Sequence, residues 1–153
     1  MRVYLSGGME YAEGEGVRWR SDMQEWIEDR LRHSVFNPNV ESNRFFSANY
    51  PGVNFRTLKN EDLGLFQEIA QKLVELDCKE IAERSDYVIC YWDDGAARGA
   101  GTKGELTMAR FFGKPVYLVT SYKLSDLPAW VLGCATRTFG SFEALKKFLT
   151  ETK

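Results

Sequence analysis

The apolar positions of the chain follow two patterns, short continuous runs and longer stretches with helical spacing. The longer stretches extend from Val17 to Leu31, from about Glu61 to Arg84, and over the C-terminal segment SFEALKKFLTETK, and they predict amphipathic helices. The short runs have the length and composition of strands. They are RVYLSG, SVFNP, DYVICYW, PVYLV and ATRTF.

Strands that alternate with helices are typical of an α/β fold with an open, doubly wound sheet, and here the pattern predicts about five parallel strands in a flavodoxin-like or Rossmann-like arrangement. The length of 153 residues predicts a single domain spanning 1–153. In such sheets, ligands bind beyond the carboxyl ends of the strands. We therefore expect the loops after VYLSG, DYVICYW and PVYLV to form one pocket.

Residues 39–59 show no clear period and are rich in Asn, Ser and aromatic residues. They predict a long loop, which in a compact domain often acts as a lid over a site. Its aromatic residues, Phe45, Phe46, Tyr50 and Phe55, are expected to be exposed. Because a small domain rarely leaves such side chains uncovered, they favour a homo-oligomer, either a homodimer or a larger assembly.

The composition of the chain limits the kinds of binding partner that we expect. A net charge of -2 and a pI near 5.5 offer no basic surface for a nucleic-acid polymer. No apolar run approaches the roughly 20 residues that span a membrane, and the first residues do not resemble a signal peptide, so we expect a soluble, cytoplasmic protein.

Metal and disulfide chemistry have little support in the sequence. The cysteines Cys78, Cys90 and Cys134 are odd in number and far apart, so we expect them to be reduced. With His33 as the one histidine, neither a zinc site nor a Ser-His-Asp triad is expected, and no cofactor is implied. Carboxylates are the remaining candidates for catalysis.

The stretch GAGTKGELTMARFFGKPVYLV contains a glycine-rich loop with three interpretations. Gly99, Gly101 and Gly104 match a dinucleotide-binding pattern, but that pattern belongs directly after the first strand, and the order of a phosphate-binding P-loop is missing. Thr102 followed by Glu105 matches a capping box, which is purely structural. Glu105 in the first turn of a helix at the carboxyl edge of the sheet also favours a catalytic carboxylate.

Several segments together resemble the nucleoside 2-deoxyribosyltransferase-like superfamily, which includes deoxynucleoside monophosphate N-glycosidases. The matching segments are VYLSGGM, FNP, DCKEIAERSDYVI and GTKGELTMARFFGKPV. The similarity spans nearly the whole chain, although only the Gly-Thr-x-x-Glu segment with its following helix and GKPV is specific. The resemblance implies a flavodoxin-like parallel sheet, usually in dimers or larger oligomers.

The same resemblance implies roles for individual residues. Glu105 is the expected nucleophile, and Tyr4 and Asp77 are expected to orient it or to assist proton transfer to the base. One departure concerns Gly99, where many members of the superfamily have an aspartate that contacts the substrate. The expected substrate-binding residues are Ser6, Gly7, Gly8, Met9, Gly101 and Thr102, with Asp93 or Asp94 as a replacement for the missing aspartate.

These residues suit cleavage or transfer at the N-glycosidic bond of a small molecule, a (deoxy)nucleoside or a nucleoside 5′-monophosphate. The alternative is a module of the same fold that binds or senses a nucleotide without turning it over. Arg18 and Arg20 are candidates for holding a 5′-phosphate. The neighbouring Glu10, Glu13 and Glu15 would oppose it, so nucleoside and nucleotide both remain open.

Overall fold

The computed structural model describes residues 1–152 and contains one sheet of five strands, all parallel to their neighbours. The strand order β2-β1-β3-β4-β5 places β1 and β3 beside each other at the point where the chain reverses its direction of travel across the sheet. This confirms the predicted α/β class and sheet. The strands are β1 Arg2–Gly7, β2 Ser34–Phe36, β3 Tyr87–Tyr91, β4 Val116–Val119 and β5 Arg137–Phe139.

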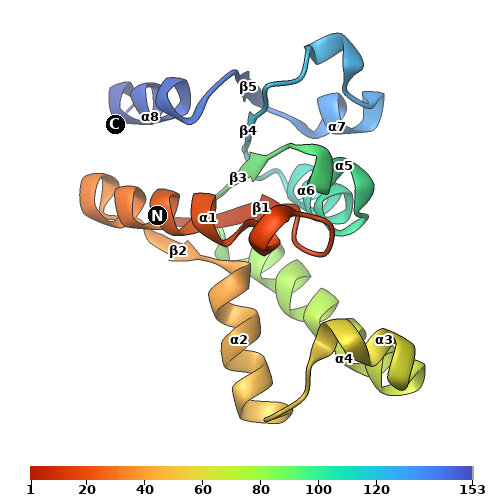
Figure 1. Ribbon diagram of the computed structural model, residues 1–153. Coiled ribbons are helices and arrows are strands. Elements are labelled where there is room, and N and C mark those ends of the chain that lie inside the picture. Colours follow the sequence, from red (N-terminus) through yellow and green to blue (C-terminus); the bar gives the residue numbers. More distant parts are fainter. Residues whose placement is uncertain (153) are drawn as a thin grey trace.

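Helices connect the strands and cover both faces of the sheet (Figure 1). Two of them, α1 and α4, are each extended at their C-terminal end by a wider turn, Ile27–Leu31 and Glu80–Arg84 respectively. The helices are α1 Val17–Trp26, α2 Pro38–Asn49, α3 Phe55–Glu61, α4 Leu63–Lys79, α5 Asp94–Arg98, α6 Gly101–Phe111, α7 Ala129–Cys134 and α8 Phe142–Glu151.

The sheet separates two hydrophobic cores because successive strand residues point to opposite faces. In β1, Val3 and Leu5 pack with α1 and α8, where Met23, Ile27 and Leu145 are buried. On the other face, Tyr4 packs with the strand residues and with α6 and α7. The face that carries α4 and α6 therefore also receives the polar ends of alternate β1 residues.

The prediction of a long loop over residues 39–59 is wrong, because α2 and α3 occupy most of that segment. The side chains of Asn37 and Asn54 cap the two helices by accepting from backbone N–H groups. Both helices lie below the sheet in Figure 1, and α3 packs beside α4. They show no clear apolar period because each packs through a few aromatic rings and not through a continuous stripe.

Those aromatic rings pack on one another and are half-buried, so the expectation that they are exposed is also wrong. Phe55 stacks on Phe66 of α4 with ring centroids 4.6 Å apart and also contacts Phe46 at 5.3 Å. The exposed aromatic side chains instead include Phe111 and Trp130, on α6 and α7, which are 82% and 67% exposed.

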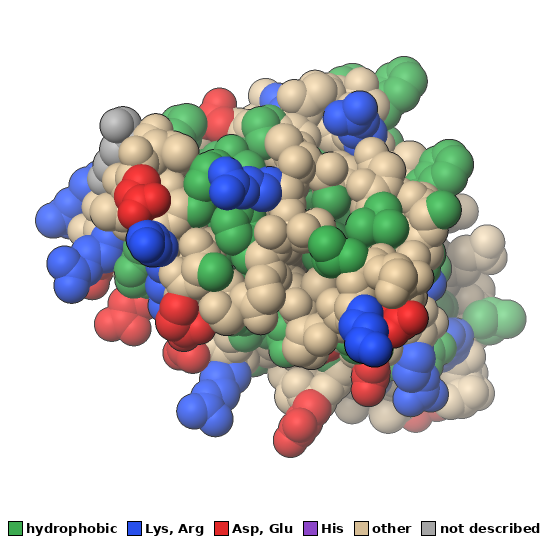
Figure 2. Space-filling view, turned by 90° about the horizontal axis from the view of Figure 1, so that it is seen from above, with side chains coloured by type: hydrophobic (Ala, Val, Ile, Leu, Met, Phe, Trp, Pro, Cys, Tyr) green, Lys and Arg blue, Asp and Glu red, His purple; other side chains and the backbone are tan. Residues whose placement is uncertain are grey.

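The surface charge, the membrane-spanning potential of the helices and the state of the cysteines were also predicted from the sequence. In Figure 2, which looks onto the side of α7 and α8, basic and acidic side chains are interspersed. No helix within residues 1–152 is both long enough and apolar enough to cross a bilayer. Cys78, Cys90 and Cys134 are free, as predicted.

Candidate active site

A cavity of about 480 Å³ lies beyond the carboxyl ends of β1 and β3. One wall is the segment Gly7–Tyr11, which follows β1, and another is the loop at residues 99–102 with the start of α6. The helices α3 and α4 complete it with side chains that include Phe55, Phe66 and Leu73. The cavity thus occupies the position where an open α/β sheet binds its ligands.

Glu105 lies on the cavity wall and is held by two hydroxyl groups of β1. The hydroxyl of Tyr4 donates to Glu105 Oε1 over 2.9 Å, and the hydroxyl of Ser6 donates to Glu105 Oε2. Because Tyr4 and Ser6 are two residues apart on one strand, both point to the same face of the sheet. The strand and α6 together fix both oxygens of the carboxylate.

This arrangement replaces the predicted capping box, which is wrong. The helix α6 has Ala100 at its N-cap position and no side-chain cap, so Thr102 already lies inside the first turn. A capping threonine needs an extended backbone at the N-cap itself. The carboxylate of Glu105 points to β1 and not back to the start of its own helix.

Asp77, on α4, lines the same cavity as Glu105. Burial, and next the charge of Glu105, raise the pKa of Asp77 to about 8, against the opposing effects of the Tyr4 hydroxyl and the Arg20 guanidinium. Asp77 therefore keeps a proton at neutral pH. A protonated carboxyl facing a cavity can donate that proton to a bound molecule.

The pKa of Glu105 is also raised by burial, but three groups lower it. They are the hydroxyls of Ser6 and Tyr4, which donate to the ionised carboxylate, and the positive charge of Arg20. Burial and the nearby Glu105 raise the pKa of Tyr4 well above its usual range, so its hydroxyl remains a donor. Neighbouring carboxyls in unequal environments are a common basis for separate acid and nucleophile roles.

Arg20 is buried beneath the segment after β1, and its guanidinium is surrounded by oxygens. This contradicts the expectation that Arg20 binds a phosphate, because its donors are already used. The sequence held one signal for this role, since Arg20 lies on the apolar stripe of α1 with Met23 and Ile27. The acceptors are the backbone carbonyls of Leu5, Gly7, Gly8, Glu15 and Gly16 and the side-chain oxygen of Asn39.

The glycines after β1 allow that segment to lie close to α5. A Cβ at Gly8 would lie 2.7 Å from backbone atoms of Gly95 and Ala96, which is too short for any side chain. Gly8 is therefore required for the close approach that closes this end of the cavity. Of the predicted substrate-binding residues, the cavity is lined by Gly7, Gly8, Met9, Gly101 and Thr102, while Ser6 reaches it through Glu105.

Asp93 and Asp94 do not line this cavity, so the structure does not bring them to the expected place. The side chain of Asp93 caps α5 by accepting from the backbone N–H of Ala96 over 2.9 Å. Asp94 accepts from the hydroxyl of Tyr122. Gly99 does line the cavity, and a Cβ at this position would lie 3.4 Å from the carbonyl oxygen of Gly95 and 3.8 Å from the ring of Tyr11.

Metal binding finds no support in the described part of the chain. Within residues 1–152, no three His, Cys, Asp or Glu side chains form a group that could hold a metal ion.

Comparison with known proteins finds solved structures that share this fold. No protein-family model and no curated protein sequence matches the chain. A 2-deoxyribosyltransferase from the psychrotolerant bacterium Bacillus psychrosaccharolyticus superposes with a TM-score of 0.66 at 20% identity, over 95% of this chain and 90% of that one. The chain shares its fold. The Clostridium botulinum CMP N-glycosidase BcmB superposes with a TM-score of 0.57 at 15% identity, over 100% of both chains. The sequence resemblance and the structural likeness therefore agree on the fold.

Proposed function

We propose that this protein cleaves or transfers at the N-glycosidic bond of a (deoxy)nucleoside or nucleoside 5′-monophosphate, with Glu105 as the nucleophile. The observation that carries the proposal is the pair of carboxyls in one cavity, Glu105 fixed by two hydroxyls and Asp77 with a raised pKa. The two superposed proteins support it, because one is a deoxyribosyltransferase and the other a nucleotide N-glycosidase.

The chemistry needs two carboxyls with different tasks. As the bond between C1′ and the base nitrogen breaks, its electron pair leaves with the base, and Asp77 supplies the proton that the base requires. The sugar carbon gains oxocarbenium character, and a Glu105 oxygen forms a bond to it. Water or a second base then attacks C1′, the bond between C1′ and Glu105 breaks as the carboxylate leaves, and Asp77 accepts the proton of the attacking group.

The proposal is tested by incubating the protein with the four common 2′-deoxynucleosides and their 5′-monophosphates and measuring released base by chromatography. Glu105→Gln keeps the size of the side chain; its amide oxygen can accept from one of the two hydroxyls and its NH2 can donate to the other, but an amide cannot capture the sugar carbon. We expect base release to fall at least about a thousandfold, the scale of removing an essential catalytic group, while ligand binding persists.

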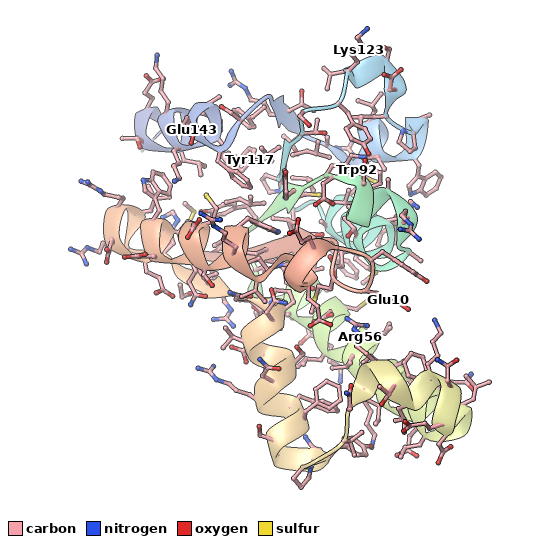
Figure 3. The ribbon with its side chains drawn as sticks, viewed as in Figure 1. Glu10, Arg56, Trp92, Tyr117, Lys123 and Glu143 are labelled. Carbon is pink, nitrogen blue, oxygen red and sulfur yellow. The ribbon has the colours of Figure 1, made fainter. Side chains whose placement is uncertain are left out.

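The matched control is Glu143→Gln, the same change on α8, far from the cavity (Figure 3). It should leave base release unchanged. Equal rates in the parent and in Glu105→Gln would refute the nucleophile assignment. Binding of these compounds without any base release would refute the enzyme and favour a nucleotide-binding module, which the glycine at position 99 already suits.

A further inference from the structure

The basic side chains that line the cavity, within residues 1–152, are both on α3 and both neutralised by glutamates. Arg56 Nε lies 2.7 Å from Glu15 Oε1, and Lys59 Nζ lies 3.0 Å from Glu10 Oε1. Figure 3 shows Glu10 and Arg56 on facing segments, the one after β1 and the other on α3. These two ion pairs connect α3 to the part of the chain that follows β1.

The two arginines that the sequence offered for a 5′-phosphate, Arg18 and Arg20, do not line the cavity. Arg20 is 1% exposed and its donors are bound to the oxygens named above. Arg18 lines a separate hollow together with Glu13 and Asp22. A phosphate in the cavity would therefore meet cations that already have carboxylate partners.

The net charge of the cavity lining depends on whether its carboxyl groups are ionised. Glu10, Asp77 and Glu105 line it together with Arg56 and Lys59, so the net charge is zero when Asp77 is protonated and -1 when it is ionised. Glu10 is also 40% exposed at its side chain, which leaves its charge open to an incoming ligand. A dianionic phosphate near Glu10 would be repelled.

The position of Asp77, the proposed acid, indicates how a substrate would lie in the cavity. Asp77 gives its proton to the base, so the base lies against the part of α4 next to Asp77, where Leu73 and Val74 provide an apolar wall. The sugar then lies between Glu105 and the segment Gly7–Tyr11. Glu10 belongs to that same segment, so a 5′ substituent of the sugar would lie on the wall that carries Glu10.

From this charge distribution we infer that the cavity accepts nucleosides with an uncharged 5′-hydroxyl in preference to their 5′-monophosphates, and that Glu10 sets this preference. The inference rests on the proposed function, since it assumes that the sugar lies beside Glu105. Glu10 acts as a specificity-determining residue in two ways. It repels a phosphate directly, and it occupies Lys59, the cation that would otherwise bind one.

The test compares base release from 2′-deoxynucleosides with release from their 5′-monophosphates, as a ratio of kcat/KM. The parent should favour the nucleosides. Glu10→Gln should shift the ratio toward the monophosphates by about tenfold, the effect of removing one charge roughly 6 Å from a dianion in water. Folding should be preserved, because the change removes only an exposed ion pair.

The matched control is Glu13→Gln, which makes the same change three residues further along the chain, outside the cavity. It should leave the ratio unchanged. The double variant Glu10→Gln/Lys59→Gln should lose most of the shift, since the released cation is gone. Salt at about 1 M should also reduce the discrimination of the parent, because the Debye length falls to about 3 Å.

The possible outcomes distinguish failure of this inference from failure of the proposed function. A parent that releases base but favours the monophosphates overturns the inference alone, as does an equal shift in Glu10→Gln and Glu13→Gln. If no base is released from either set of compounds, the proposed function fails, and the inference fails with it.

Discussion

Replacing Asp77 with asparagine should stabilise the protein while it removes the proposed acid. The folded-state pKa of Asp77 is raised to about 8, whereas an unfolded aspartate has a pKa of about 3.9. Between these values the folded state keeps a proton that the unfolded chain has lost. Stability therefore falls as pH rises through this window.

The size of the effect follows from the same shift. At pH 7 the raised pKa of Asp77 lowers the free energy of unfolding by at most about 4 kcal/mol, at 1.36 kcal/mol per pKa unit. The loss is smaller than this limit because Asp77 is partly open to the cavity. An asparagine side chain at this position carries no such cost, since it has no charge to desolvate. We expect Asp77→Asn to unfold at a higher temperature than the parent at pH 7, and the two curves to converge near pH 4.

Thermal and urea unfolding from pH 4 to pH 8 measure this difference, and base release over the same range provides a second readout. Release by the parent should decline as pH passes about 8, because Asp77 then loses its proton. In Asp77→Asn the activity should be low throughout. The reasoning is refuted if the parent is equally stable at pH 5 and pH 8, or if the asparagine variant is less stable at pH 7.

Three further predictions concern the rest of the molecule. Arg20→Met leaves buried carbonyls without donors and should cost roughly 3 to 5 kcal/mol in urea unfolding, and a loss under 1 kcal/mol would contradict the role of Arg20 in the segment after β1. Light scattering should find at least a homodimer, and Phe111→Ser should weaken it, because Phe111 is 82% exposed; a monomeric parent at micromolar concentration would contradict this. Amide hydrogen exchange in α2 and α3 should slow when a deoxynucleoside binds, because α3 lines the cavity, and unchanged exchange at saturation would exclude a lid.

The alternation of apolar runs and helical stretches was enough to predict the sheet, because buried parallel strands and amphipathic helices differ in period. It failed at residues 39–59, where the helices pack through single rings on neighbouring helices, Phe46 on Phe55 and Phe55 on Phe66, and these contacts leave no apolar period in the sequence. The caps at Asn37 and Asn54 were visible in the sequence, and Pro38 after Asn37 is a typical helix start.

The candidate site was predictable in part. The rule that parallel strands end at one edge placed Glu105 near the end of β1, and the family resemblance supplied Tyr4 and Asp77. The bonds of Glu105 to Tyr4 and Ser6 join residues about a hundred positions apart, so local patterns such as the Thr102 capping box could not reveal them. The same limit applies to Arg20, whose acceptors are mostly backbone carbonyls.

The two hydroxyls that hold Glu105 lie two residues apart on β1, an interior strand of the sheet, with the buried side chain of Leu5 between them facing the opposite core. A slip of one residue in the pairing of β1 would turn both hydroxyls away from Glu105 and place Leu5 where a polar group belongs. Under the proposed function, a correctly aligned sheet and a competent nucleophile would therefore be acquired in a single step of folding. Recovery of enzymatic turnover after denaturation would then report on strand alignment.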